Sequence, residues 1–249
     1  MTSRLLTVGL LAGLGAGILV AGLQTVVTTP LILHAEVFEG AEEAAPAPHS
    51  HDAAPADAAA PAAMASEHHH DAEDWAPADG LERTGYTALA TVATAIGFAL
   101  MLVSVMVFSG TRPSVHTGLA WAAAAFAATG LAPALGLSPE LPGMPAADLT
   151  ARQLWWVATA AATAIGLWLL IRRPEAGLKV VGVALLVLPH VIGAPHLAGE
   201  EASAVPPELA ARFAAASLTL HAILWALIGA FSGWLWQRLE RRAPGLAPA

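Results

Sequence analysis

The chain contains 249 residues, of which 56% are hydrophobic and only 12% are charged. An average soluble domain carries about 25% charged residues, so this composition excludes an ordinary soluble fold. The formal net charge of −8 disfavours nucleic acid as a partner. The sequence has no cysteine, which excludes disulfides, thiolate nucleophiles, iron–sulfur clusters and cysteine-type zinc sites.

Six long runs without charged residues follow one another along the chain. They cover residues 5–33, 84–111, 113–139, 153–171, 180–199 and 213–237. A helix needs roughly 20 apolar residues to cross the hydrocarbon core of a membrane. We therefore expect an all-α integral membrane protein, a bundle of about six transmembrane helices. The fifth run is the least regular, because Pro189 and Pro195 interrupt it.

The length of the first run indicates whether it is a membrane anchor or a cleaved signal peptide. A signal peptide has an apolar stretch of about 7–15 residues before a cleavage site of small residues. Run 5–33 is longer, and residues 24–29 contain no Ala-x-Ala pattern. We interpret residues 1–33 as an uncleaved N-terminal transmembrane helix. Residues 34–83 form an acidic outer loop, 84–242 a bundle of about five helices, and 243–249 a tail.

The distribution of Lys and Arg predicts the orientation in the membrane, because cytoplasmic loops are enriched in both. With a cytoplasmic N-terminus and six spans, eight of these residues lie inside and three outside. The eight are Arg4, Arg112, Arg172, Arg173, Lys179, Arg238, Arg241 and Arg242. We therefore expect both termini in the cytoplasm, the loop in the periplasm, and a strongly acidic outer face.

Glycines at four-residue spacing mark candidate contacts between helices. Gly9, Gly13 and Gly17 lie in the first run, and Gly229 and Gly233 lie in the sixth. Small residues at this spacing let helix backbones approach closely in lipid. We interpret them as packing residues.

The outer loop contains a mixture of imidazoles and carboxylates. Residues 40–78 consist mainly of Ala, Pro, Asp, Glu and His, a composition that predicts disorder. Five histidines fall within 22 residues: His49, His51, His68, His69 and His70. Imidazole and carboxylate together bind ions such as Zn²⁺, Ni²⁺ and Co²⁺. The segment predicts a metal-collecting loop, and the alternative is a solvated acidic linker whose histidines are incidental.

Two histidines fall inside predicted spans, where ionisable residues are costly and usually functional. His190 lies in the fifth run and His221 in the sixth. Counted from the outer ends at about 1.5 Å per residue, their depths are similar. Pro189, Pro195 and Gly193 favour an unwound end of the fifth span. We hypothesise a cation site there that includes His190, His196 and His221.

Other residues at the outer ends of the spans could contribute to this site. His34, Glu36 and Glu39 follow the first run, so we include them among the candidate metal ligands. Asp148 and Arg152 are four residues apart, before the fourth run. That spacing predicts a salt bridge or a helix start rather than a set of ligands.

No catalytic motif is found in the sequence. The patterns GxxxxGK[ST], HExxH and GxSxG are absent, so we expect neither ATP hydrolysis by this chain nor another enzymatic activity. Two alternatives to metal transport stay open. Histidines on facing helices could hold a haem in a membrane redox protein, or the chain could be a non-transporting metal-buffering or assembly subunit.

Several short motifs resemble one known family. They are PLILHAEVFE at 30–39, DGLERT at 79–84, LAPALG at 131–136, PELPGMPAADL at 139–149, RQLWW at 152–156, LPH at 188–190 and GAP at 193–195. In order and type they resemble the predicted cobalt transporter subunit family CbtA. The resemblance implies Co²⁺ uptake across the bacterial inner membrane for cobalamin synthesis. It also implies a small CbtB-like partner with one span and its own histidines. Family members are usually described with five spans.

These observations favour an inner-membrane subunit of a divalent-metal uptake transporter. The ion is Co²⁺ or Ni²⁺, gathered by the loop and passed to the histidine site between the spans. The metal is cargo, and no permanent cofactor is expected.

Overall fold

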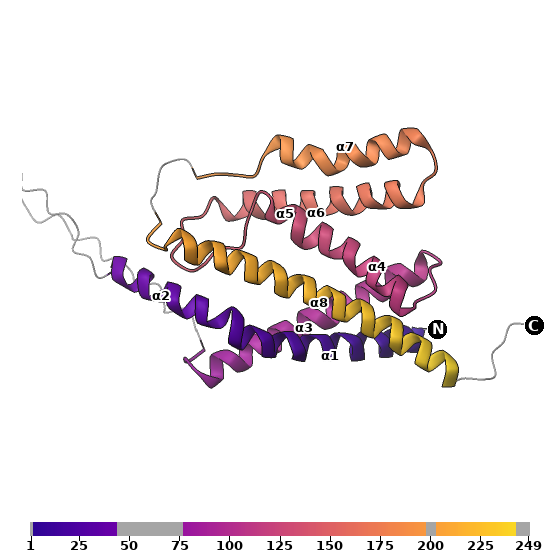
Figure 1. Ribbon diagram of the computed structural model, residues 1–249, viewed down its shortest axis with the longest axis horizontal. Helices are drawn as coiled ribbons and strands as arrows, with labels where there is room; N and C mark the ends of the chain where they lie inside the picture. The colour runs from indigo at the N-terminus through magenta and orange to yellow at the C-terminus, as the bar shows by residue number, and fades with distance from the viewer. Residues whose placement is uncertain (1, 44–76, 198–202, 243–249) are drawn as a thin grey trace, which may run out of the picture.

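The computed structural model describes residues 2–43, 77–197 and 203–242, and all secondary structure in these residues is helical (Figure 1). The elements are α1 (Thr2–Val27), α2 (Thr29–Glu43), α3 (Leu81–Phe108), α4 (Val115–Phe126), the π-helical turn η1 (Ala127–Leu131), α5 (Ala132–Ala134), α6 (Leu149–Arg172), α7 (Ala176–Ile192) and α8 (Pro207–Arg242).

Five helical segments of the described chain are long and apolar enough to cross a membrane. They are α1, α3, α6, α8 and the continuous stretch Val115–Ala134 that joins α4, η1 and α5. Helix α7 is apolar but has only 17 residues. It runs antiparallel beside α6 (Figure 1), so the chain still passes along the bundle six times. The predicted all-α membrane bundle is confirmed.

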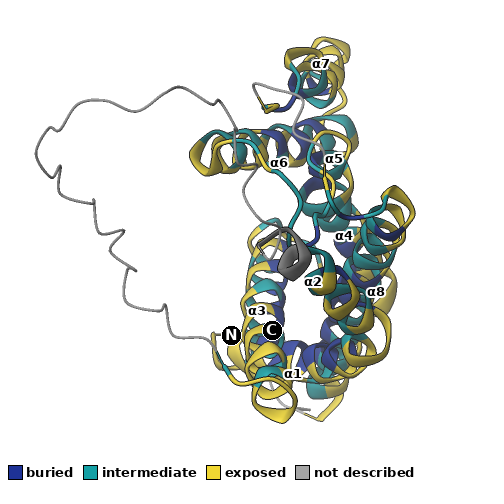
Figure 2. Cartoon of the chain, turned by 90° about the vertical axis from the view of Figure 1, so that its left-hand side faces the viewer, coloured by how far each residue is buried: buried dark blue, intermediate teal, exposed yellow. Residues whose placement is uncertain are grey.

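The helices form two groups. Helix α1 packs against α3 and α8, and α4 packs against α8. Helices α6 and α7 form a pair beside this group, joined to it mainly through η1 and α5. Figure 2 looks along the bundle and shows buried positions between α1, α3, α4 and α8, with α7 at the edge. Among the described helices, α7 contacts α6 alone.

Glycines set the closest helix contacts, as their spacing predicts. A Cβ atom at Gly9, Gly13 or Gly17 would lie within 3 Å of an atom of α3, and for Gly13 that atom is the Cα of Ile96. At the α4–α8 crossing, a Cβ on Gly118 would lie 2.1 Å from the carbonyl oxygen of Gly229. Because no side chain intervenes, the backbones touch, which strengthens van der Waals contact in lipid.

The first predicted span divides into two helices. Helix α1 ends at Val27, and α2 continues from Thr29 to Glu43, beyond the predicted loop boundary at residue 34. Pro30 explains the division, because its ring has no N–H and clashes with the preceding turn. At the fifth predicted span, by contrast, proline does not divide the helix. Helix α7 continues through Pro189 and ends three residues later, at Ile192.

Ion pairs join the helix ends at both ends of the bundle. Glu240 at the end of α8 pairs with Arg4 of α1 and with Arg112, which follows α3. The start of α1 and the end of α8 therefore lie at one end (Figure 1), as an even number of passes requires. Glu36–Arg83 and Glu140–Arg152 are the corresponding pairs toward the other end. Which end faces the cytoplasm stays a prediction.

The Gly118–Gly229 contact yields a test of the packing. We expect Gly118→Ala to destabilise the protein by about 1–3 kcal/mol, because the backbones of α4 and α8 must move apart. Gly97→Ala is the matched control, since a Cβ at Gly97 meets no atom within 4 Å. Thermal unfolding in detergent should show a lower Tm for Gly118→Ala alone. Equal Tm values for both variants would contradict the close contact.

Candidate functional site

A cavity of about 530 Å³ lies between α6, α8 and the segment that runs from η1 through α5 to the following loop. Its described lining combines an apolar wall with a few polar groups. The lining residues are Thr129, Gly130, Pro133, Ala134, Leu137, Ser138, Pro139, Glu140, Leu149, Arg152, Gln153, Trp156, Val157, Ser217, Leu218 and His221. Such a cavity, mostly apolar with a few converging polar groups, is typical of a binding site.

The π-helical turn forms one wall of this cavity. The N–H of Ala132 donates to the carbonyl of Ala127, five residues back, which widens the helix. Pro133 follows and has no N–H to donate, so this stretch has fewer internal hydrogen bonds than an α-helix. Gly130 lies in the turn, and a Cβ there would come within 2.8 Å of the His221 ring. The turn therefore provides the space that the imidazole occupies, and π turns are frequent at functional sites.

The side chains of His221, Thr129 and Trp225 form one polar cluster. The indole N–H of Trp225 donates to Nε2 of His221 at 2.9 Å and to Oγ1 of Thr129 at 3.1 Å. Nε2 of His221 and Oγ1 of Thr129 are 3.3 Å apart. The Thr129 hydroxyl donates its single proton to the carbonyl of Ala125 at 2.8 Å. Oγ1 of Thr129 is consequently an acceptor toward both rings.

This geometry allows two proton arrangements on a neutral imidazole. In the first, Nε2 accepts from Trp225 and the proton is on Nδ1. In the second, Nε2–H and the indole N–H both donate to Thr129 and Nδ1 carries a lone pair. The two rings must then move apart, because two N–H groups repel one another at the observed 2.9 Å. Nδ1 has no hydrogen-bond partner among the described residues. The second arrangement therefore gives a metal ligand whose other ring nitrogen is oriented by a hydroxyl, as metal-binding histidines usually are.

A partly buried ion pair lines the same cavity. Arg152 of α6 donates from Nη2 to the carboxylate of Glu140, and about a quarter of each side chain is exposed, 26% and 25%. Nε of Arg152 is buried and has no partner among the described residues. Asp148 caps the start of α6, where its Oδ1 accepts from the N–H of Ala151 at 2.8 Å. The helix-start prediction for Asp148 is confirmed, while Arg152 pairs with Glu140.

A second cavity of about 310 Å³ lies beyond this cluster. Its described lining is mainly apolar, with contributions from α3, α4 and α6 such as Met101, Ala124 and Leu167. Thr129 lines both cavities, and Trp225 lines the second. The Thr129–His221–Trp225 cluster therefore lies between the two cavities.

The structure does not bring the predicted histidines together. The ring of His190, on α7, lies edge-on to Trp155 of α6, with 6.2 Å between ring centroids. His196 is exposed in the non-helical segment after α7. Because α7 contacts α6 and not α8 among the described helices, His190 and His221 share no interface. Similar depth did not imply the same face of the bundle.

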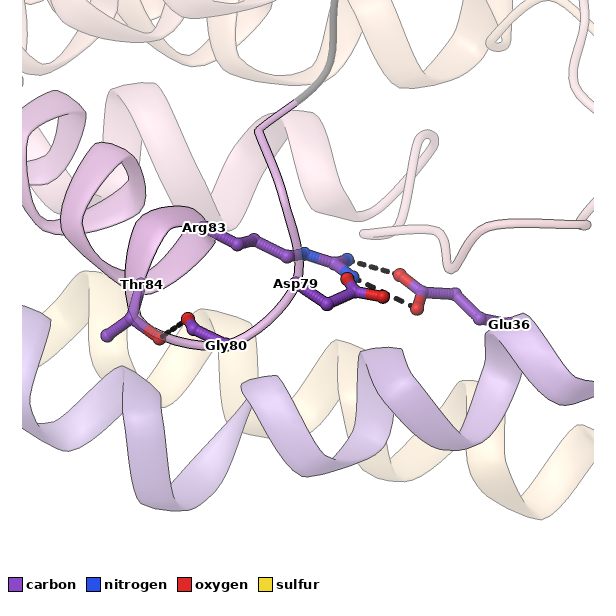
Figure 3. A network of polar contacts seen from close by, with 5 residues as sticks. All are labelled: Glu36, Asp79, Gly80, Arg83 and Thr84. Carbon is purple, nitrogen blue, oxygen red and sulfur yellow. Dashed lines mark hydrogen bonds and ion pairs between the residues drawn. The ribbon is translucent and has the colours of Figure 1, made fainter.

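The candidates next to the first span have structural partners instead. His34 is exposed and contacts Phe38, with 5.6 Å between ring centroids. Glu36 accepts from two nitrogens of Arg83, which also bonds Asp79 at 3.3 Å (Figure 3). The hydrogen bonds from Arg83 hold the pKa of the Glu36 carboxyl below its ordinary value, against the opposing effect of burial. This network attaches α2, which lies outside the spanning segments, to the start of α3.

The remaining predicted ligands are Glu39 and the five histidines of the loop. The side chain of Glu39 and all of His49, His51, His68, His69 and His70 lie outside the described residues. Within the described part of the chain, no group of three or more His, Asp or Glu side chains is arranged to hold a metal ion. A metal at His221 would therefore complete its coordination with water, hydroxyl or carbonyl oxygens, or with a partner subunit.

Sequence reasoning missed two members of the cavity. Thr129 lies in an alanine-rich span, where a hydroxyl at membrane depth was the available signal. Glu140 was noticed only as part of the PELPG motif, because a pairing with Arg152 twelve residues later depends on the path of the loop.

The Glu36–Arg83 pair yields a pH test. Its contribution to stability is complete above the ordinary pKa near 4.5 and is lost as the pH falls through the lower pKa of the folded state. We expect the Tm of Glu36→Gln to fall less than that of the wild type between pH 6 and pH 3.5. Glu82→Gln is the control, because Glu82 is exposed and forms no ion pair with a described residue. Parallel Tm curves for wild type and Glu36→Gln would exclude this contribution.

Comparison with known protein families gives a match over most of the chain. The model of the family described as "Probable cobalt transporter subunit (CbtA)" matches residues 2–237. Neither the curated proteins nor the solved structures yield a match to this chain. The matched region includes every helix up to the last turns of α8, the cavity and the motifs that resemble this family. The chain belongs to the CbtA family of probable cobalt transporter subunits.

Proposed function

We propose that this chain is the inner-membrane subunit that takes up Co²⁺, or Ni²⁺, through the cavity that ends at His221. The observation that carries the proposal is the position of His221. It is the one histidine that lines a described cavity, and that cavity lies in a chain of a cobalt transporter subunit family. Imidazole is a suitable ligand for both ions.

The proposed binding step uses the second proton arrangement of the cluster. Nδ1 of His221 binds the ion while Nε2–H donates to Thr129, 3.3 Å away. Trp225 then donates to Thr129, which accepts from both rings. Without metal, Trp225 donates to Nε2 and the proton returns to Nδ1. Nε2 and the indole N–H therefore each keep a hydrogen-bond partner in both states, which matters at membrane depth because an unsatisfied polar group is costly there.

Two further parts of the proposal concern the rest of the transporter. The histidines between residues 49 and 70 collect metal outside the membrane and raise its concentration near the cavity. A small single-span subunit with its own histidines, like CbtB, supplies additional ligands. Its contribution would explain why the described residues of this chain form no complete coordination shell.

A haem-binding redox function receives no support from the geometry. Two axial histidines would have to face one another across neighbouring helices. His190 and His221 lie on α7 and α8, which do not pack together. A metal-buffering role without transport is an outcome of the first experiment below.

Radiolabelled Co²⁺ uptake tests the role of His221. The chain is expressed with its small partner, and variants are compared at matched membrane levels. We expect His221→Gln to lower uptake at least tenfold, because the amide accepts from Trp225 but is a poor metal ligand. Thr129→Val should lower apparent affinity roughly tenfold, the low end of the effect of losing an orienting partner. His190→Ala is the matched control and should retain wild-type uptake.

The outcomes separate the hypotheses. An equal loss of uptake in His190→Ala and His221→Gln would support a site shared by both histidines. Wild-type uptake in both variants would remove His221 from the path but keep transport. If Co²⁺ binds to the purified wild type while uptake stays at the empty-vector level, the chain is a metal buffer.

Uptake also tests the loop. Replacing His49, His51, His68, His69 and His70 together with Asn should raise the half-saturating Co²⁺ concentration several-fold. The maximal uptake rate should stay unchanged, because the loop only delivers the ion. Asn substitutions at His34 and His116 are the control for a general loss of imidazoles. A lower maximal rate in the loop variant alone would place the loop on the conducting path.

A further inference from the structure

We propose that the Glu140–Arg152 ion pair is the outer gate of the cavity, and that Glu140 is the carboxylate ligand that first binds the incoming divalent cation. In this proposal Arg152 exchanges Glu140 for Asp148 when the gate opens. The inference rests on the proposed function, because it assigns residues to the entry step of the same cavity.

Charge around the cavity points to Glu140. Among the described lining residues it is the one carboxylate, and Arg152 is the one permanent cation. The two side chains pair directly, so their charges cancel within the lining of the cavity. A divalent cation that leaves water needs negative charge, and carboxylate oxygen is a common ligand for such ions. Glu140 can supply that charge only after Arg152 has released it.

Asp148 is placed to receive Arg152. The two residues are four positions apart at the start of α6, which makes them neighbours on the helix surface. Oδ1 of Asp148 caps the helix by accepting from Ala151, and the other carboxylate oxygen has no hydrogen bond to a described residue. Nε of Arg152 is likewise without a partner. Both groups of the proposed open-state pair therefore have unused hydrogen-bonding capacity.

The start of α3 shows that such a pairing is possible. There Arg83 bonds Glu36 of a preceding segment and also Asp79, four residues before it (Figure 3). Both sites have an Asp four positions before an Arg and a Glu from an earlier segment. At the start of α6 these residues are Asp148, Arg152 and Glu140. Arg83 holds both carboxylates at once, whereas Arg152 bonds only Glu140. At the start of α6, one of the two neighbouring carboxylates is therefore still available to the arginine.

The absence of native cysteine allows a direct test of the gate. Ser217 lines the cavity one helical turn before His221, so Ser217→Cys introduces the only thiol there. In lipid nanodiscs, a charged methanethiosulfonate reagent modifies this thiol at a rate that depends on gate opening. Adding Asp148→Ser should slow modification roughly two- to fivefold, the effect of losing a surface i,i+4 pair. Serine preserves the N-cap hydrogen bond of α6.

Two companion variants complete the labelling experiment. Adding Glu140→Gln should accelerate modification, because the ion pair is lost. Adding Asp79→Ser should leave the rate unchanged, since Asp79 occupies the equivalent position at α3, away from the cavity. Equal rates for Asp148→Ser and the Ser217→Cys parent would overturn the exchange of partners.

Co²⁺ uptake separates a gate from a ligand. Asp148→Ser should raise the half-saturating concentration by the same two- to fivefold, because fewer molecules are open. Glu140→Gln should raise it further although its cavity is more accessible, because the carboxylate ligand is missing. Uptake by Glu140→Gln that equals the wild type would overturn the ligand role. If the wild type itself takes up no Co²⁺, the proposed function fails, while the labelling rates still decide whether the ion pair opens and closes.

Discussion

The π-helical turn between Ala127 and Leu131 is the constraint on which the site depends. A regular α-helix there would place Thr129 and Gly130 at a different angle, about 100° per residue. The wider turn directs Oγ1 of Thr129 to the two rings of α8, and Gly130 provides the space for His221. Pro133 then follows within the same span. The stretch with fewer internal hydrogen bonds therefore lines the cavity.

The sequence was sufficient for the fold because membrane helices obey a few strong rules. Charge-free runs located every pass along the bundle, and glycine spacing identified the packing positions of α1 and α8, whose partners α3 and α4 only the structure shows. Boundaries were less predictable. Hydropathy continues through Thr28 and Pro30, although the backbone divides there into α1 and α2. Pro189 stands within α7, because its preceding turn can rearrange around one lost hydrogen bond.

The site was only partly predictable, for a geometric reason. A sequence gives the depth of a residue in a span but not the direction in which that face of the span points. His190 and His221 have similar depths, yet His190 faces Trp155 of α6 and His221 faces α4 and η1. Contacts that depend on the path of a loop could not be predicted from the sequence either. Arg152 has a carboxylate four residues before it in Asp148, but the loop after α5 returns Glu140 to it instead.

Electrostatics connects these contacts to transport. In the state observed, Glu140 cancels the charge of Arg152, and a neutral His221 satisfies Trp225. A cavity at membrane depth is most stable without net charge, because charges there lose hydration. An entering Co²⁺ adds two positive charges, and the release of Arg152 from Glu140 leaves one carboxylate charge to offset part of them. In the proposed exchange, Arg152 moves toward Asp148 at the solvent-exposed start of α6, and this single movement frees the charge of Glu140. At the same distance, one free carboxylate attracts a divalent cation about twice as strongly as a monovalent one, so the freed Glu140 favours divalent cations.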